Sequence, residues 1–370
     1  MWVRRNSFSL FQIGHGSILI VQYIPGPFGL VTVAALGNPP QPFRLYVDLL
    51  WDTLFVPNAS LSTQYCDPGF EMLRYRANES STAEPSDLGW YHMEQNLVVF
   101  SGPAALDTFR IGGGDLRVER QPFMAVEHAQ PASLLNLWIN YDGVLGLSPR
   151  WKNTSAEPTA SHLPSPWTRM VRDGVLDDNV FAIEVPRAAR GGFDYDGSNG
   201  DVGPTAGAMT FGGVADKYRD AEFAALPLVV RDDDRAWAVA AQSVRWANRT
   251  QPIDYRFHAS TIAVFSTQWI IGLPGPLAAR IHRSIPEWAG KQCGMGLLCF
   301  INCAARRHLP DLVFELAGQS FTVTAFQYAY RVVDPKGEGI SAPSISSPRQ
   351  YTQRKGGRSP KTPLFLGAPF

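Results

Sequence analysis

The residue with the clearest chemical potential is Asp48, which lies in the stretch FRLYVDLLWDTLFVPNAS that covers residues 43–60. An apolar run leads directly into this carboxylate, and two bulky residues, Leu49 and Leu50, follow it. A carboxylate can act as a general acid or base when a second titratable group lies close by. A lone carboxylate in a loop is more often satisfied by backbone donors and has only a structural role. The chemistry of Asp48 therefore depends on what the fold brings next to it.

Other common catalytic and ligand-binding patterns are absent from the sequence. The seven histidines form no His-Glu-x-x-His motif, and no Gly-x-Ser-x-Gly elbow of a serine hydrolase occurs. The acidic stretch DYDGSNGDVGPT (194–205) has Asn199 where a calcium loop needs Gly and Thr205 where it needs Glu, so it indicates a surface turn. We expect neither a metal site nor a cofactor.

The elements that must position Asp48 are mostly strands. Short apolar runs bounded by Gly, Pro, Asn and Asp recur along the chain, including GLVTVAALG, FRLYVDLLW, NLVVFSG, DTFRIGGG, AMTFGG and DLVFELAGQSFTVTAF. Two segments have helical features instead. In the first, Ser165 is the N-cap, Pro166 takes the first helical position and Gly174 ends the helix; the second begins at Pro276. The sequence therefore predicts a mainly β protein with a few short helices.

The composition limits the partners that the protein can have. The chain has 370 residues, of which 45% are hydrophobic and 18% charged, as in a well-buried globular protein. Lys+Arg and Asp+Glu balance at 33 each, so no net charge attracts nucleic acid. No apolar run approaches the roughly 18 residues that a membrane-spanning helix needs. We expect no nucleic-acid partner and no membrane span.

Seven segments, taken in order, give the chain a resemblance to the pepsin-like aspartic endopeptidases over nearly its whole length. Each is a short match to a segment of that family, and their shared order carries the comparison. The segments are GLVTVAALGNPPQPFRLYVD, LFVPNAS, ALDTFRIGGG, YDGVLGLSP, SPWTRMVRDGVLDDNVFAIEV, AMTFGGVADKY and CAARRHLPDLVFELAGQSFTVTAFQY. The resemblance implies a bilobal, mainly β fold with a substrate cleft between the lobes.

In that family each lobe supplies one Asp from an Asp-Thr/Ser-Gly loop, and the two carboxylates hold a water and share a proton, an effect for which the family is a standard illustration. Asp48 matches the first Asp, but Leu49 and Leu50 replace the hydroxyl residue and the glycine. Counting back from Pro274 in AVFSTQWIIGLP places Phe265 at the second Asp position. Phe265 cannot transfer a proton, so the resemblance implies a broken dyad.

The β-hairpin flap that covers the cleft in this family departs from the pattern as well. Counting back from Asp107 puts Gln95 at the position of the flap tyrosine. Tyr91 takes that role only if the alignment shifts by four residues.

These observations favour an inactive pseudoprotease that retains a cleft for an extended peptide or protein segment. We expect it to be a monomer. The alternative is an active aspartic endopeptidase whose second loop is misaligned or whose gene model is incomplete, so membership of the family leaves the activity open. A third alternative is a degenerate chain that does not fold stably.

The resemblance also suggests a domain organisation. Residues 1–25 form an N-terminal segment with some features of a signal peptide, residues 26–185 the first lobe and residues 186–334 the second lobe. Residues 335–363 are rich in Pro, Ser, Gly and basic side chains and are expected to be a disordered insert. Residues 364–370 match the start of a late strand of the second lobe, which breaks off at the end of the chain.

Cysteines and glycosylation motifs indicate the compartment. Asn-x-Ser/Thr motifs occur at Asn58, Asn78, Asn153 and Asn248, which favours a secreted glycoprotein or one in the endo-lysosomal lumen. Cys293, Cys299 and Cys303 are candidates for a local disulfide, with free thiols as the alternative. Cys66 has no cysteine near it in the sequence and remains unassigned.

Overall fold

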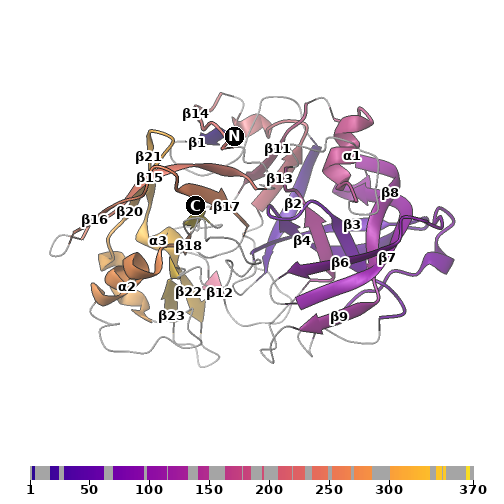
Figure 1. Ribbon diagram of the computed structural model, residues 1–370, viewed down its shortest axis with the longest axis horizontal. Helices are drawn as coiled ribbons and strands as arrows, with labels where there is room; N and C mark the ends of the chain where they lie inside the picture. Colours follow the sequence, from indigo (N-terminus) through magenta and orange to yellow (C-terminus); the bar gives the residue numbers. More distant parts are fainter. Residues whose placement is uncertain are drawn as a thin grey trace.

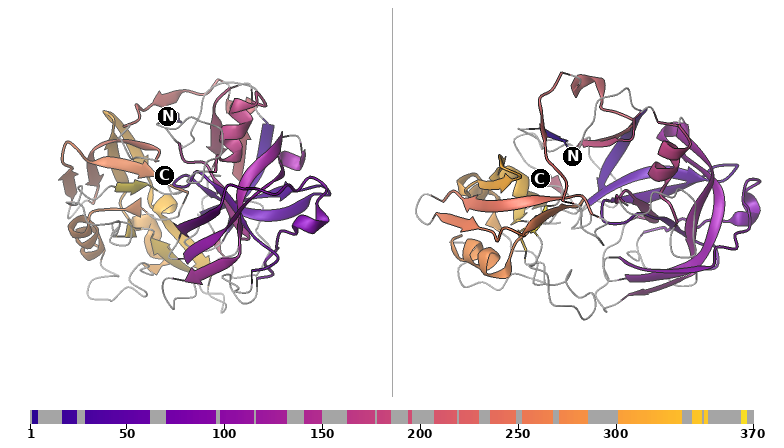
Figure 2. Two further views of the ribbon diagram at one scale, coloured as in Figure 1. Left: turned by 45° about the vertical axis from the view of Figure 1, so that its right-hand side comes forward. Right: turned by 45° about the horizontal axis from the view of Figure 1, so that its top comes forward.

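The computed structural model describes residues 2–4, 17–24, 29–61, 70–95, 98–114, 116–131, 141–149, 163–176, 178–184, 194–195, 207–218, 220–229, 236–248, 252–267, 271–285, 301–333, 339–343, 345–346 and 364–366. In this part of the chain strands dominate and the helices are short, which confirms the predicted mainly β class. The two halves of the chain form two lobes that lie side by side in all three views (Figures 1 and 2).

The first lobe is built on an 11-stranded sheet among the described residues. Its strands follow the order β11-β13-β2-β3-β4-β10-β5-β8-β7-β6, and β9 pairs with β7. Their bounds are β2 Ser17–Ile24, β3 Gly29–Leu36, β4 Gln41–Asp48, β5 Leu54–Pro57, β6 Trp90–Gln95, β7 Val98–Ile111, β8 Leu116–Val126, β9 His128–Pro131, β10 Gly143–Gly146, β11 Phe181–Glu184 and β13 Gly207–Phe211.

The second lobe contains an 8-stranded sheet among the described residues, in the order β21-β20-β15-β17-β25-β18-β24 with β16 beside β15. The bounds are β15 Ala238–Trp246, β16 Ile253–Arg256, β17 Ile262–Phe265, β18 Ile271–Gly272, β20 Leu312–Leu316, β21 Gln319–Val323, β24 Ile345–Ser346 and β25 Leu364–Leu366. A smaller sheet joins β12 Asp194–Tyr195, β22 Ala329–Val333, β23 Gly339–Pro343 and β19 Ile301–Asn302. Strand β1 Trp2–Arg4 pairs with β14 Phe223–Ala225.

The helices of the described residues are short. They are α1 Pro166–Arg172, α2 Gly275–Arg283 and α3 Ala325–Tyr328, with 3-10 turns at Ala77–Glu79, Gly112–Gly114, Asp216–Tyr218 and Cys303–His308. The predicted start of α1 is confirmed, because the Ser165 hydroxyl accepts a hydrogen bond from the Thr168 amide and Pro166 opens the helix. Gly174 follows the helix in the left-handed conformation, as its predicted role as a stop requires.

Two predicted boundaries need correction. Residues 17–24 of the N-terminal segment form β2, which lies between β13 and β3 inside the first sheet, so their apolar pattern belongs to a strand of the folded lobe. The boundary predicted at 185/186 does not interrupt that sheet, because β13 (207–211) pairs with both β11 and β2. The pairing of β13 joins residues distant in the sequence, which a boundary placed from short local segments does not take into account.

The segment predicted as a disordered insert contains ordered structure. Within 335–363, β23 pairs antiparallel with β22 and β24 pairs parallel with β18. Strands β22 and β18 offer backbone donors and acceptors that need partners, and this demand outweighs a local composition of Ser, Gly and Pro. Residues 347–363 lie outside the described residues.

Candidate active site

Asp48 is the last residue of β4, and the fold holds it tightly. Its side chain is 4% exposed, one carboxylate oxygen accepts a hydrogen bond from the Leu50 amide at 2.7 Å, and its carbonyl accepts one from the Leu147 amide at 2.7 Å. Strand β10 runs parallel to β4 and places Gly146 beside Asp48. The carboxylate therefore sits in a rigid turn immediately after a central strand.

Hydrophobic packing fills the loop that follows Asp48. Leu49 is 3% exposed and belongs to the main core cluster, which spans both lobes. Leu50 packs against Ala238, Ile262 and Val264, a small cluster of the second lobe. The two residues that replace the family's hydroxyl and glycine thus contribute apolar contacts at the junction of the lobes.

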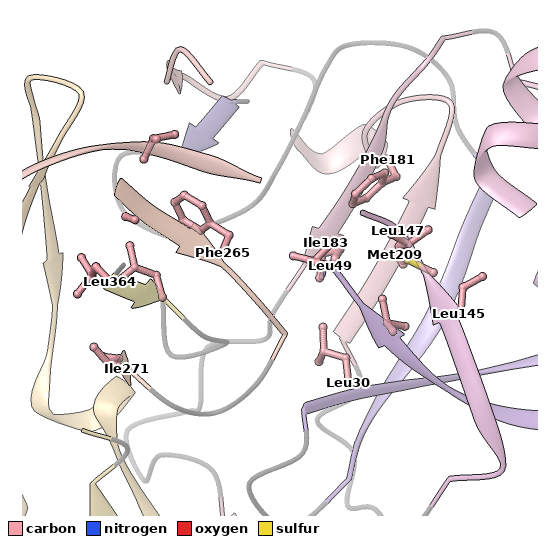
Figure 3. Packing of buried hydrophobic residues seen from close by; sticks show 14 of the residues in the cluster. Leu30, Leu49, Leu145, Leu147, Phe181, Ile183, Met209, Phe265, Ile271 and Leu364 are labelled. Carbon is pink, nitrogen blue, oxygen red and sulfur yellow. The ribbon is translucent and has the colours of Figure 1, made fainter. Parts of the chain in front are cut away.

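The second loop begins at the end of β17. Phe265 is 6% exposed and belongs to the main core, in the part that contains Ile271 and Leu364 (Figure 3). Figure 3 shows Leu49 on the first-lobe side of this cluster and Phe265 on the second-lobe side. Ser266 and Thr267 follow and are also buried, and the Ser266 amide donates to the Leu366 carbonyl at 2.9 Å. Residues 265–267 therefore bring two hydroxyl groups and a phenyl ring, but no carboxylate, to this loop.

Hydrogen bonds from the second lobe join the two loops directly. The Thr267 hydroxyl donates to the Val47 carbonyl, the residue before Asp48, and lies 3.1 Å from the Tyr46 hydroxyl. The indole N–H of Trp237 donates to the Leu147 carbonyl at 2.9 Å. Sequence reasoning missed these two residues, although a hydroxyl residue in the second loop was a visible signal. The loops are thereby held at fixed positions relative to each other.

The hairpin formed by β6 and β7 carries the two flap candidates. Tyr91 pairs with Gly102 and lies half-buried against the first-lobe cluster that contains Phe100 and Met124, and burial raises the pKa of the Tyr91 hydroxyl. Gln95 is the last residue of β6, at the end of the described part of the hairpin. The predicted hairpin therefore exists, and which of the two residues acts as the flap residue stays a prediction.

The glycosylation motifs differ in their surroundings. Asn78 is exposed in the turn Ala77–Glu79, whereas the side-chain amide of Asn58 donates to a Glu127 carboxylate oxygen at 2.8 Å. Asn248 is half-buried after β15, and Asn153 lies outside the described residues.

The disulfide prediction also lies outside the described residues, since only the backbone of Cys303 is placed among the four cysteines. In the part of the chain that is described, no group of three or more His, Cys, Asp or Glu side chains is arranged to hold a metal ion. Within the same residues no helix is long and apolar enough to cross a membrane.

Comparison with known proteins gives a consistent picture. A family model described as eukaryotic aspartyl protease matches residues 30–351. Vacuolar protease A of Aspergillus fumigatus is 27% identical over 324 residues, which cover 88% of this chain and 72% of that protein. Vacuolar aspartic protease of Candida albicans is 24% identical over 325 residues, with 87% and 67% covered. Pregnancy-associated glycoprotein 1 of Ovis aries is 25% identical over 346 residues, with 92% and 79% covered.

Proposed function

The chain belongs to the eukaryotic aspartyl protease family, and we propose that within it this protein is a pseudoprotease that binds an extended peptide or protein segment between its lobes. The observation that carries this proposal is the second loop, where residues 265–267 are Phe, Ser and Thr. The family's reaction needs a carboxylate from each lobe, and here only Asp48 is in place.

The missing carboxylate removes a chemical function and not only a binding contact. One carboxylate must take a proton from the attacking water while the other gives a proton to the scissile carbonyl. Loss of such general acid–base chemistry lowers a rate by about 10²–10⁴-fold, before the loss of the second anchor for the water is counted. The packing of Leu49 and Leu50 adds to this, because apolar side chains replace the groups that shape the first loop.

Binding of an extended peptide does not need the dyad. An extended chain is recognised by main-chain hydrogen bonds and by recesses for alternate side chains. The β6–β7 hairpin and the joined loops around Asp48 supply the framework for such recognition. We therefore expect binding to have survived the loss of catalysis.

A second candidate is residual peptide hydrolysis. Asp48 is retained, its carboxylate is oriented by the Leu50 amide, and the Thr267 contact holds the second loop close to it. This candidate requires a second carboxylate that the sequence as given does not place in the loop, from a different alignment or a corrected gene model.

We propose an endo-lysosomal, vacuolar or extracellular compartment, in line with relatives that are named vacuolar proteases or a glycoprotein. Our candidate glycan acceptor is Asn78, because it is exposed, whereas the Asn58 side-chain amide binds Glu127 and Asn248 is half-buried. A disulfide among Cys293, Cys299 and Cys303 fits the same compartment.

The test is hydrolysis of an unfolded protein substrate at mildly acidic pH, with and without a statine-type aspartic protease inhibitor. The natural chain and Asp48→Asn should both be silent, while an active family member processed in parallel should cleave. A peptide library presented to the natural chain should yield extended ligands. Inhibitor-sensitive cleavage that disappears in Asp48→Asn would establish an enzyme instead.

A further inference from the structure

We propose that Ser266, rather than Phe265, occupies the position opposite Asp48 where the second carboxylate of the dyad would stand. This inference rests on the proposed function, because it specifies what the broken site contains. Phe265 was the expectation from counting along the sequence, whereas strand pairing, side-chain alternation and a hydrogen bond between the loops all point to the next residue.

Strand pairing gives the first argument. In the first lobe, β10 runs parallel to β4 with Leu145 opposite Val47 and Gly146 opposite Asp48. In the second lobe, β25 runs parallel to β17 with Leu366 opposite Phe265. In the sequence a glycine follows each of these leucines, as Leu145-Gly146 and as Leu366-Gly367. When Leu366 is matched with Leu145, Phe265 corresponds to Val47 and Ser266 corresponds to Asp48.

Side-chain alternation gives the second argument. Along a strand, successive side chains point to opposite faces. In β4, Leu45 and Val47 belong to the main core while Tyr46 belongs to a separate cluster. In β17, Ala263 and Phe265 belong to the main core while Val264 belongs to the cluster that contacts Leu50. Phe265 therefore has the core-facing role of Val47.

The residue after Val47 and the residue after Phe265 should each point to the face opposite the main core. Asp48 follows Val47 and, on the same pattern, Ser266 follows Phe265. If Phe265 corresponded to Asp48 instead, its ring would point away from the main core, whereas it is 6% exposed and part of that core. Burial of Phe265 is thus explained by packing and not by a position at the reacting centre.

The hydrogen bond between the loops gives the third argument. The Thr267 hydroxyl donates to the carbonyl of Val47, the residue immediately before Asp48. An ideal Cβ on Gly29 would lie 2.2 Å from the Thr267 carbonyl oxygen, so the backbone of the first lobe approaches this residue closely. Thr267 is therefore the second-loop residue that contacts the turn at Asp48, and Ser266 is the residue directly before it.

The one-residue difference has a simple cause. Phe365 pairs with Gly272 in the second lobe, as Val144 pairs with Phe55 in the first. The loop from Ser266 to Gly272 is then one residue shorter than the loop from Asp48 to Phe55. Counting back from Pro274 does not detect this deletion and stops one residue early, at Phe265.

The assignment changes the chemistry of the site. A hydroxyl opposite Asp48 carries no charge, so the two groups have no reason to share a proton, as two neighbouring carboxylates must. The Asp48 carboxylate oxygens can then accept hydrogen bonds from ligands that present an N–H group or an amine. Inhibitors whose central hydroxyl binds a proton-sharing dyad lose that interaction.

The experiment introduces a carboxylate at each candidate position and follows the titration of Asp48 by NMR of ¹³C-labelled aspartate, with Asp48→Asn identifying its signal. In Ser266→Asp the two carboxylates should titrate as a coupled pair, with the upper midpoint displaced by more than about one pH unit. In Ser266→Asn the new side chain has the shape of aspartate but no charge, so the titration of Asp48 should remain as in the natural chain.

Phe265→Asp supplies the opposing case. It places a charge in the core, so it should reduce the thermal unfolding midpoint markedly or prevent folding, and no coupling to Asp48 should be seen. The proposal is overturned if Asp48 titrates in Ser266→Asp as it does in the natural chain, or if Phe265→Asp folds and couples to Asp48. Hydrolysis by the natural chain would contradict the proposed function but would leave this titration result unaffected.

Discussion

The side chains in the loop after Asp48 make mainly apolar contacts. The Asp48 carboxylate is oriented by a hydrogen bond from the Leu50 amide. The Leu49 side chain belongs to the main core, whereas the Leu50 side chain packs against the small second-lobe cluster of Ala238, Ile262 and Val264. Fully burying a leucine contributes about 1.5–3 kcal/mol relative to leaving it exposed. The loop after Asp48 therefore gains stability from the apolar packing of Leu49 and Leu50.

A second buried carboxylate of this lobe, Asp107, is structural. It is fully buried and accepts hydrogen bonds from the Tyr75 hydroxyl at 2.7 Å, the Thr82 hydroxyl at 2.6 Å and the Thr108 amide at 2.7 Å. Burial, reinforced by the hydrogen bond to Asp107, raises the pKa of the Tyr75 hydroxyl well above its usual value. The folded protein therefore keeps this proton at pH values where the unfolded chain loses it.

We predict that Tyr75→Phe lowers the free energy of unfolding by about 1.5–3 kcal/mol at pH 7, since a charged acceptor loses a donor. The pKa of Tyr75 is raised in the folded protein, so its contribution to stability is fully present below the pKa of about 10 that tyrosine has in the unfolded chain. This contribution is lost as the pH rises from there towards the pKa of the folded state. The gap between the natural chain and Tyr75→Phe should therefore narrow by about 1.4 kcal/mol per pH unit above pH 10. Denaturant unfolding at pH 8 and pH 11 measures it.

Thr82→Val is the matched control for this prediction. It removes another hydroxyl donor from Asp107 but no group that titrates in this range. The difference in free energy of unfolding between Thr82→Val and the natural chain should be the same at both pH values. A Tyr75→Phe gap that is also constant would show that Tyr75 ionises equally in the folded and unfolded states.

Strand β10 leaves no room for a side chain at either of its two glycines. An ideal Cβ on Gly146 would lie 2.5 Å from the Thr53 amide nitrogen and 2.6 Å from the Trp51 carbonyl oxygen, both of which are backbone atoms. Gly143, at the start of the same strand, meets the Phe55 carbonyl oxygen at 2.1 Å. These approaches give a physical reason for both glycines of the YDGVLGLSP segment: β10 is wedged between β4 and β5.

We predict that Gly146→Ala lowers the free energy of unfolding by about 3 kcal/mol, because the backbone at Trp51 and Thr53, just before β5, cannot move aside without disturbing the sheet. Gly174→Ala should cost only about 1–2 kcal/mol, since it combines a left-handed backbone with open space within 4 Å. Denaturant unfolding of both variants measures the difference. Equal losses would mean that the loop at Trp51–Thr53 yields more easily than the distances indicate.

Elements were predicted from the sequence with more success than their partners. The start and stop of α1 depend on Ser165, Pro166 and Gly174, which act within a few residues, so the sequence alone identifies them. The pairing of β17 with β25 joins residues about a hundred positions apart, and the register there decides between Phe265 and Ser266. A local count cannot detect a one-residue deletion in a loop.

The same limit explains β2 and β23. Considered alone, the sequence of β2 has some features of a signal peptide and that of β23 is typical of a polar insert. Each segment nevertheless pairs with a neighbouring strand, β2 with β3 and β23 with β22, that needs backbone partners. Asp48 could be identified from its local pattern and its place in the family segments. The contact of Thr267 with Val47 could not, because it exists only after both lobes have folded and docked.

At the level of the whole molecule, the two lobes share one apolar core and a small number of polar links. The main cluster includes Val47 and Leu49 of the first lobe and Phe265 and Ile271 of the second. The ring of Trp237 lies 5.5 Å from that of Phe181 and 5.9 Å from that of Trp167, in addition to its hydrogen bond to Leu147. The lobes should therefore unfold together.

We predict that Thr267→Val lowers the free energy of unfolding by about 1–3 kcal/mol, because the Val47 carbonyl loses a buried donor while the shape is kept. Thr267→Ser retains the hydroxyl and should cost less. Scanning calorimetry of the natural chain should give a single transition whose van't Hoff and calorimetric enthalpies agree, the criterion for lobes that unfold as one unit.

Combining Thr267→Val with Trp237→Phe should separate the lobes thermally. The double variant lacks the hydrogen bonds of the Thr267 hydroxyl and of the Trp237 indole, while the phenyl ring preserves much of the apolar contact with Phe181. Its van't Hoff enthalpy should fall below the calorimetric value as two transitions emerge. If the double variant still unfolds in one transition with equal enthalpies, the shared apolar core alone couples the lobes. In that case the two lobes would stay docked without the Thr267 contact, and changes in the second loop could be made without separating them.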